Sequence, residues 1–126
     1  YQFAGRADLI AWDLERLALL HIENRTRFPD LQSMAGSFNG KRAYLASSIG
    51  ERLGVNRWAS QTHVIAALWS AEVLHAVRLR TESFRSLCPD PPDAFAAWWS
   101  GAVPGIAASS SLIVLDPPST RPRAIT

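Results

Sequence analysis

The sequence predicts one α/β domain built on a mixed β-sheet, and three observations lead to this prediction. Residues 2–12 and 17–26 are apolar segments around a polar turn, a helical pattern starts at Leu31, and residues 62–69 are almost entirely apolar. A chain of 126 residues can form one domain with a core and is too short for two ordinary ones. Its 48% hydrophobic and 19% charged residues exclude a disordered chain.

The first two segments are predicted strands, because apolar, β-branched and aromatic residues dominate them without helical spacing. The turn Asp13-Leu14-Glu15-Arg16 is short enough to join them as an antiparallel hairpin. Phe28-Pro29-Asp30 then ends the second strand, and Asp30 can cap a helix.

The helix predicted from Leu31 has one apolar face, formed by Met34, Phe38, Leu45, Ile49 and Leu53. The pair Asn39-Gly40 leaves two possibilities open. It splits the region into two helices, or it lowers the stability of one helix by about 1 kcal/mol relative to alanine. Gly54 is the expected end.

The segment Thr62–Trp69 is a strand candidate that is apolar on both faces. Such strands usually lie inside a sheet that is covered by helices, commonly a parallel one. Ser111–Leu115 is the last strand candidate, and residues 1–116 are expected to form the domain. Residues 117–126 carry three prolines and no large aromatic residue, so we expect a disordered tail.

Three helices are expected between these last two strands. They run from a Ser70 cap to Arg80, from a Thr81 cap to Cys88-Pro89, and from Asp90-Pro91 to Trp99. The order strand, strand, helix, strand, helices, strand is typical of an α/β layer with a mixed sheet.

Two acids lie within or beside the apolar hairpin segments. A hairpin centred near residues 14 and 15 brings Asp8 beside residues 21 to 23 of its neighbour, so Asp8 and Glu23 can meet on one face, with Arg25 one step further along. Adjacent carboxylates repel unless a cation lies between them, and Mg²⁺ or Mn²⁺ is the natural candidate. The structural alternative is ion pairing of the two acids with Arg6, Arg25 or Arg27.

The hairpin ADLIAWDLERLALLHIENRTR resembles the PD-(D/E)XK nuclease superfamily, whose fold is the restriction-endonuclease-like mixed sheet flanked by helices. Asp8, fourteen intervening residues and then Glu23-Asn24-Arg25 resemble its D-x(n)-E-x-K motif, and the hairpin is similar to that of bacterial members. Members carry a helix and usually a strand before the aspartate-bearing strand. The resemblance therefore implies that these elements precede Tyr1 or come from a partner.

The resemblance implies metal-dependent hydrolysis of phosphodiesters in DNA. Asp8 and Glu23 would hold Mg²⁺ or Mn²⁺ together with the main-chain carbonyl of Asn24, and the ion would activate the attacking water. Arg25 stands where the motif has lysine; it can brace a phosphate but cannot deprotonate water. Lys41 on the following helix can supply the missing ammonium if its helix face points at the hairpin.

The basic residues that follow the hairpin are compatible with a polyanionic partner. Arg27, Lys41 and Arg42 are the candidate nucleic-acid contacts, and members of the superfamily often dimerise, which allows a homodimer. Two other classes of function remain open: a catalytically inactive nucleic-acid-binding or regulatory module of the same fold, and a protein-interaction domain. No long apolar run or signal segment is present, so a cytoplasmic protein is expected.

The histidines, the cysteine and the tryptophan pair are expected to have structural roles. His21 in its strand is more often hydrogen-bonded than a ligand, and His63 and His75 lack the spacing of a zinc site. Cys88, the only cysteine, is expected to be a small buried residue at a helix end. The pair Trp98-Trp99 cannot bury both rings on one helix face, so one ring is expected to be exposed.

Overall fold

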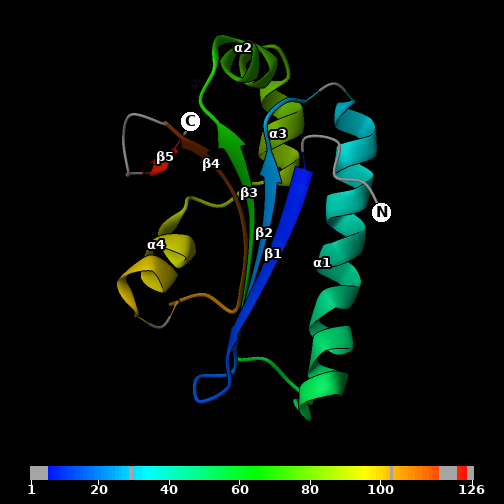
Figure 1. Ribbon diagram of the computed structural model, residues 1–126, viewed down its shortest axis with the longest axis vertical. Coiled ribbons are helices and arrows are strands. Elements are labelled where there is room, and N and C mark those ends of the chain that lie inside the picture. The colour runs from blue at the N-terminus through cyan, green and yellow to red at the C-terminus, as the bar shows by residue number, and fades with distance from the viewer. Residues whose placement is uncertain (1–5, 29, 103, 117–121, 125–126) are drawn as a thin grey trace.

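The chain starts with the expected hairpin. The computed structural model describes residues 6–28, 30–102, 104–116 and 122–124 (Figure 1). Strands β1 (Arg6–Asp13) and β2 (Ala18–Arg25) pair antiparallel. The Asp13 carboxylate accepts hydrogen bonds from the amides of Glu15 (3.1 Å) and Arg16 (3.3 Å), which holds the turn between the strands.

The sheet is mixed and its strands lie in sequence order. Strand β3 (Ser60–Leu68) pairs parallel to β2, and β4 (Ala108–Leu115) pairs parallel to β3. The short β5 (Pro122–Ala124) pairs antiparallel to β4 at the edge. Residues 62–67 of β3 are all buried, as its pattern predicts for a central parallel strand. The predicted α/β class with a mixed sheet is confirmed.

Helix α1 (Leu31–Leu53) is continuous through Asn39-Gly40, which decides the alternative left open by the sequence. The Asp30 carboxylate accepts from the amide of Ser33 at 3.0 Å, and Gly54 ends the helix at φ 73°. Both predicted ends are therefore confirmed. The helix buries the expected apolar residues Met34, Phe38 and Leu45 against the sheet.

The three later helices are shorter: α2 (Ala71–Leu79), α3 (Thr81–Leu87) and α4 (Asp93–Ser100). Ser70 caps α2 as predicted, since its hydroxyl accepts from the amide of Val73. The predicted Thr81 cap is wrong, because Thr81 is the first residue of α3 and its hydroxyl donates back to carbonyls of α2. Asp90 accepts from the Ser110 amide at 2.8 Å, and α4 begins three residues later than the predicted opening at Asp90.

Helices cover both faces of the sheet, so the molecule has three layers (Figure 1). One core lies between the sheet and α1, α2 and α3, and it includes Phe38, Ile65, Val73, Phe84 and Val114. A smaller core lies beneath α4 on the other face, where Phe95 and Trp98 pack against Leu20, Val64 and Ile113. Trp99 is 73% exposed, as expected of one member of the tryptophan pair.

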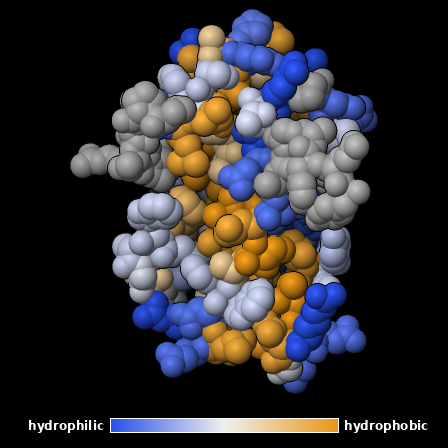
Figure 2. Space-filling model, in the orientation of Figure 1, coloured by the Kyte–Doolittle hydropathy of each residue, from blue (hydrophilic) through white to orange (hydrophobic). Residues whose placement is uncertain are grey.

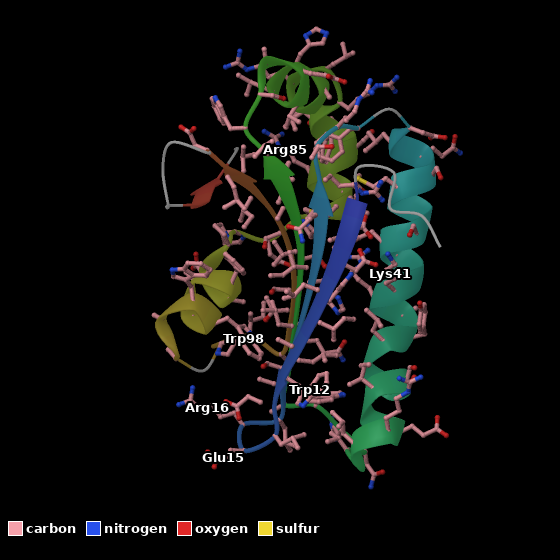
Figure 3. All side chains as sticks on the ribbon, viewed as in Figure 1. Trp12, Glu15, Arg16, Lys41, Arg85 and Trp98 are labelled. Atoms are coloured by element: carbon pink, nitrogen blue, oxygen red, sulfur yellow. The ribbon has the colours of Figure 1, made fainter. Side chains whose placement is uncertain are left out.

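Among the described residues, no helix lies over the front of the sheet in the view of Figure 1. Figure 2 shows a hydrophobic band down the middle of the face that is seen in Figure 1. The large exposed apolar side chains of the hairpin are Leu9, Trp12, Leu14 and Leu17. Arg16 at the hairpin tip donates to the carbonyl of Gly101 at the end of α4, which ties the tip to that helix (Figure 3).

The expectation of a disordered tail covers residues 117–126. Within that stretch Pro122–Ala124 form β5, and the other residues lie outside the described part of the chain. Among the described residues no helix is long and apolar enough to cross a bilayer.

Candidate metal centre

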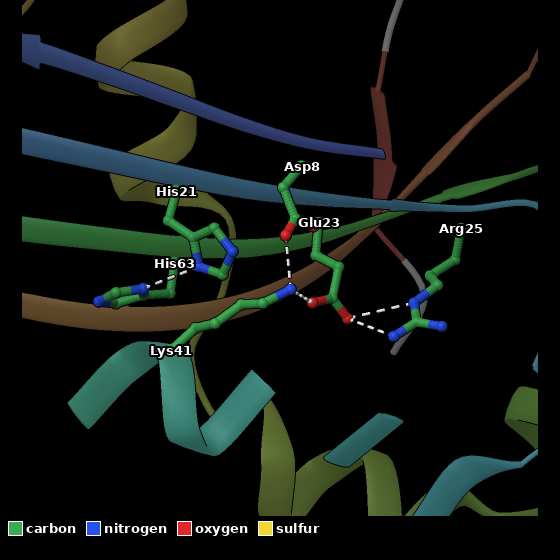
Figure 4. A network of polar contacts seen from close by, with 6 residues as sticks. All are labelled: Asp8, His21, Glu23, Arg25, Lys41 and His63. Carbon is green, nitrogen blue, oxygen red and sulfur yellow. Dashed lines mark hydrogen bonds and ion pairs between the residues drawn. The ribbon is translucent and has the colours of Figure 1, made fainter. Parts of the chain in front are cut away.

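The hairpin register places the two acids side by side. Asp8 of β1 lies directly opposite Glu23 of β2, as the sequence predicts. Both side chains point toward α1, where the Glu23 side chain is completely buried and that of Asp8 is 33% exposed (Figure 4). Without a cation between them, two carboxylates in this arrangement would repel each other.

Lys41 supplies that cation from α1. Its Nζ lies 2.5 Å from Oδ2 of Asp8 and 3.0 Å from Oε1 of Glu23 (Figure 4). The helix face that carries Lys41 thus points at the hairpin. The sequence analysis required this orientation for Lys41 to supply the missing ammonium. Its side chain is only 15% exposed, so the pair of contacts is largely shielded from solvent screening.

Arg25 binds the second oxygen of Glu23. Its Nε and Nη2 both donate to Oε2, at 3.1 and 2.8 Å, and its side chain is 13% exposed. Two donors on one acceptor fix the carboxylate more firmly than a single bond would. The structural alternative considered for Glu23, an ion pair with Arg25, is therefore present, and it coexists with the Lys41 contact. Asp8, Glu23, Lys41 and Arg25 form a network with no net formal charge.

A histidine pair borders these acids. His21 of β2 and His63 of β3 are paired in the parallel ladder, and their Nδ1 atoms are 3.1 Å apart. Burial lowers the pKa of His21, and burial, His21 and Arg42 lower the pKa of His63 to about 4. Both shifts favour the neutral form of the ring at pH 7. The sequence did not indicate this pair, because its members are 42 residues apart.

Three residues of this region can hold a metal ion. Asp8, His21 and Glu23 each offer one ligand atom, and these atoms lie within 4.8 Å of one another. Two carboxylate oxygens and one imidazole nitrogen form a donor set that suits a divalent cation. The cluster contains the two predicted metal ligands and adds His21. Asn24 pairs with Ala7 and Ala66 in the sheet, and its role as a carbonyl ligand stays a prediction.

The remaining predicted site residues lie outside this network. Arg27 is exposed and pairs with the exposed Glu72 at 3.2 Å. Arg42 is partly buried: it donates to Ser110 Oγ (2.7 Å), the Leu87 carbonyl (3.4 Å) and Asn39, and its guanidinium lies over the Phe38 ring. Their contacts with nucleic acid stay predictions, and Arg27 is the more exposed of the two.

Cys88 lies at a helix end as expected, but it is partly buried rather than buried. It is the residue that ends α3, and its amide donates to the Phe84 carbonyl. Burial raises the pKa of its thiol to about 12, so the reactive thiolate is scarce at neutral pH.

No protein-family model, curated protein or solved structure matches this chain. The resemblance to the nuclease superfamily therefore depends on the hairpin residues and on the element order.

Proposed function

We propose that the protein hydrolyses phosphodiester bonds of DNA with a divalent metal ion at Asp8 and Glu23. The observation that carries the proposal is the contact of Lys41 with both acids. The PD-(D/E)XK motif requires two acids and a lysine, and Arg25 occupies the lysine position in this sequence. The Lys41 ammonium completes the same set of charges from a neighbouring helix.

Each residue of the set has a distinct role in the proposed reaction. Asp8 and Glu23 would hold Mg²⁺ or Mn²⁺, with the Asn24 carbonyl as a further ligand, and the ion supplies Lewis acidity and a more acidic water. Lys41 lies close enough to the carboxylates to orient the attacking water and to offset the charge that develops on the phosphate. Arg25 is a positioning residue, because its two bonds hold Oε2 of Glu23.

Lys41 would have to move slightly when a metal ion enters. Its Nζ now lies between the two carboxylates, where the ion would bind. A lysine side chain is long and has four rotatable bonds, so its ammonium can shift toward the substrate while its stem stays packed. The proposal therefore requires that metal and ammonium occupy neighbouring positions.

The decisive experiment measures cleavage of plasmid and linear single-stranded DNA with Mg²⁺ or Mn²⁺. We expect Asp8→Ala, Glu23→Ala and Lys41→Met each to lower the rate by about 100-fold or more. Glu82→Gln is the matched control, since Glu82 is an exposed acid of α3 that pairs only with Arg85 among the described residues. If folded Asp8→Ala and Glu23→Ala proteins still cut at the wild-type rate, the site assignment is wrong.

A catalytically inactive DNA-binding module is the second candidate, and the same network favours it. Lys41 and Arg25 balance both carboxylates without any metal ion. A wild-type protein that binds DNA in a salt-dependent manner but never cuts it with either metal would establish this candidate. Binding to another protein that is insensitive to salt would instead favour an interaction domain that uses exposed apolar side chains of the hairpin such as Leu9 and Trp12.

A further inference from the structure

The imidazole of His21 has one nitrogen with no partner. His21 is completely buried, its ring stacks on Phe38, and among the described residues its Nε2 makes no hydrogen bond. Figure 4 shows this nitrogen on the side of the ring that faces Asp8 and Glu23. Buried polar atoms are nearly always paired, so an unpaired one beside two carboxylates points to a missing ligand.

The neighbouring hydrogen bonds decide which nitrogen of His21 carries the proton. Gln61 Oε1 can only accept, so Nε2 of His63, which lies 3.3 Å away, must donate to it. In a neutral ring the Nδ1 of His63 then has the lone pair and accepts from Nδ1–H of His21. Nε2 of His21 is left with a lone pair that is directed at the acids.

In a metal-binding histidine, one ring nitrogen has a free lone pair and the other has a hydrogen-bonded N–H. In such sites the second nitrogen donates to a group that fixes the tautomer and the ring orientation, and His63 has that position here. The ligand atoms of Asp8, His21 and Glu23 lie within 4.8 Å of one another. Ligands bound at about 2.0 to 2.2 Å from one ion are separated by at most about 4.4 Å, so only a small contraction is needed.

We propose that Nε2 of His21 is the third protein ligand of this metal centre, so that the centre prefers a divalent transition metal such as Mn²⁺ over Mg²⁺ or Ca²⁺. The inference rests on the metal site of the proposed function, although it does not require that DNA is cut. Mg²⁺ and Ca²⁺ prefer oxygen ligands alone, whereas first-row transition ions bind imidazole nitrogen as well. The nitrogen therefore discriminates between the two classes of ion.

The test measures binding of Mn²⁺ and of Mg²⁺ to the whole chain without DNA, by electron paramagnetic resonance of free Mn²⁺ and by calorimetry. We expect wild type to bind Mn²⁺ about tenfold or more tightly than Mg²⁺, and His21→Phe to lose most of that preference while it retains Mg²⁺. The phenyl ring keeps the stacking on Phe38. His75→Phe is the matched control, because His75 is exposed on α2.

A measurement on wild type avoids dependence on the folding of a variant. Nitrogen chemical shifts of the imidazoles should show an unprotonated Nε2 in His21, and substoichiometric Mn²⁺ should broaden the signals of His21 before those of His75. A protonated Nε2, or equal affinity for Mn²⁺ and Mg²⁺ in wild type, would overturn the inference.

The outcomes separate this inference from the proposed function. Mn²⁺ binding that depends on His21 in a protein that never cuts DNA supports the inference and contradicts hydrolysis. Cleavage with Mg²⁺ that His21→Phe leaves intact, together with no Mn²⁺ preference, supports hydrolysis and overturns the inference. A chain that binds neither ion contradicts both.

Discussion

Glu23 is the most enclosed charge of the site. Its side chain is fully buried, and its two oxygens are bound by Lys41 and by Arg25. A buried carboxylate is tolerated only when its lone pairs are satisfied by cations or donors, as they are here. Asp8 differs, because its side chain is one-third exposed and makes one ion pair, with Lys41, among the described residues.

This difference predicts unequal effects of neutralising the two acids. Glu23→Gln should lower the free energy of unfolding by about 3 kcal/mol, because it leaves two partly buried cations with a single carboxylate. Asp8→Asn should cost less, about 1 kcal/mol, because the Asp8 side chain is one-third exposed and Lys41 keeps its contact with Glu23. Urea denaturation at neutral pH without added metal measures both. Stabilisation by Glu23→Gln would mean that the carboxylates repel each other and that Lys41 does not lie between them in solution.

The lowered pKa of His63 predicts a pH-dependent loss of stability. The pKa falls from 6.5 in the unfolded chain to about 4 in the folded protein, so between these values the unfolded state binds more protons. The stabilisation is complete above pH 6.5 and is lost as the pH falls toward 4, by about 3 kcal/mol between pH 7.5 and pH 4.

Comparison of variants isolates this contribution from the titration of the carboxylates. His63→Gln should show a smaller loss of unfolding free energy over the same pH range, while His75→Gln on the exposed face of α2 should follow wild type. Equal pH profiles for wild type and His63→Gln would show that His63 titrates normally in the folded protein.

At the scale of elements, α1 positions the catalytic ammonium of the proposed function. Lys41 follows Phe38 by three residues and precedes Leu45 by four, so it lies on the same face as the buried apolar residues. A lysine on the apolar stripe of a helix indicates a buried ionic partner, and this pattern was readable in the sequence. The helical pattern does not show which acid Lys41 contacts, because Lys41 and Asp8 are 33 positions apart in the chain.

Replacement of glycine by alanine should have opposite effects on stability at two positions of α1. A Cβ at Gly40 would meet nothing within 4 Å, so Gly40→Ala should stabilise the protein by about 0.5 to 1 kcal/mol through helix propensity. A Cβ at Gly50 would lie 2.5 Å from the carbonyl oxygen of Val55, a backbone atom that cannot easily move. Gly50→Ala should therefore destabilise, despite the same gain in propensity.

Thermal unfolding followed by circular dichroism measures both variants. Gly36→Ala provides the matched control, because Gly36 is also exposed on α1 and a Cβ there would have open space. If Gly50→Ala is as stable as Gly36→Ala, the contact between α1 and the loop that follows it is looser than the structure indicates.

At the scale of the whole molecule, two arginines with the same predicted role occupy different environments. Arg42 joins α1 to β4 and to the end of α3 through Ser110 and the Leu87 carbonyl, whereas Arg27 lies at the surface beside Glu72. An arginine that is satisfied inside the protein contributes to stability, and one that is exposed is available to phosphate.

The two alanine variants should therefore separate stability from DNA binding. Arg42→Ala should lower the free energy of unfolding by about 2 kcal/mol, because it leaves acceptors of three segments unpaired. Arg27→Ala should leave the free energy of unfolding nearly unchanged. It should also make the slope of log affinity against log salt concentration less steep by about 1, because one phosphate contact is lost. Fluorescence anisotropy at several salt concentrations measures the second effect. A salt slope that Arg27→Ala leaves unaltered would remove Arg27 from the residues proposed to contact DNA.

Features that depend on short stretches of chain could be predicted from residue types and their alternation. The register of a tight hairpin is local, so alternation alone predicted that Asp8 and Glu23 meet, and caps at Asp30, Gly54 and Ser70 were visible as residue types. The buried parallel β3 was predicted for a related reason, because a strand covered on both faces must be apolar at nearly every position.

The contacts between distant side chains of the site depend on how the helices and strands pack. The contacts of Lys41 with Asp8, of His21 with His63 and of Arg42 with Ser110 join residues 33, 42 and 68 positions apart. Such contacts depend on how the helices and the parallel strands pack, and sequence periodicity carries no information about that packing beyond the face that is buried. The acids of this centre were therefore predictable, while its ammonium partner and its histidine were decided by the packing of α1 and β3 against the hairpin.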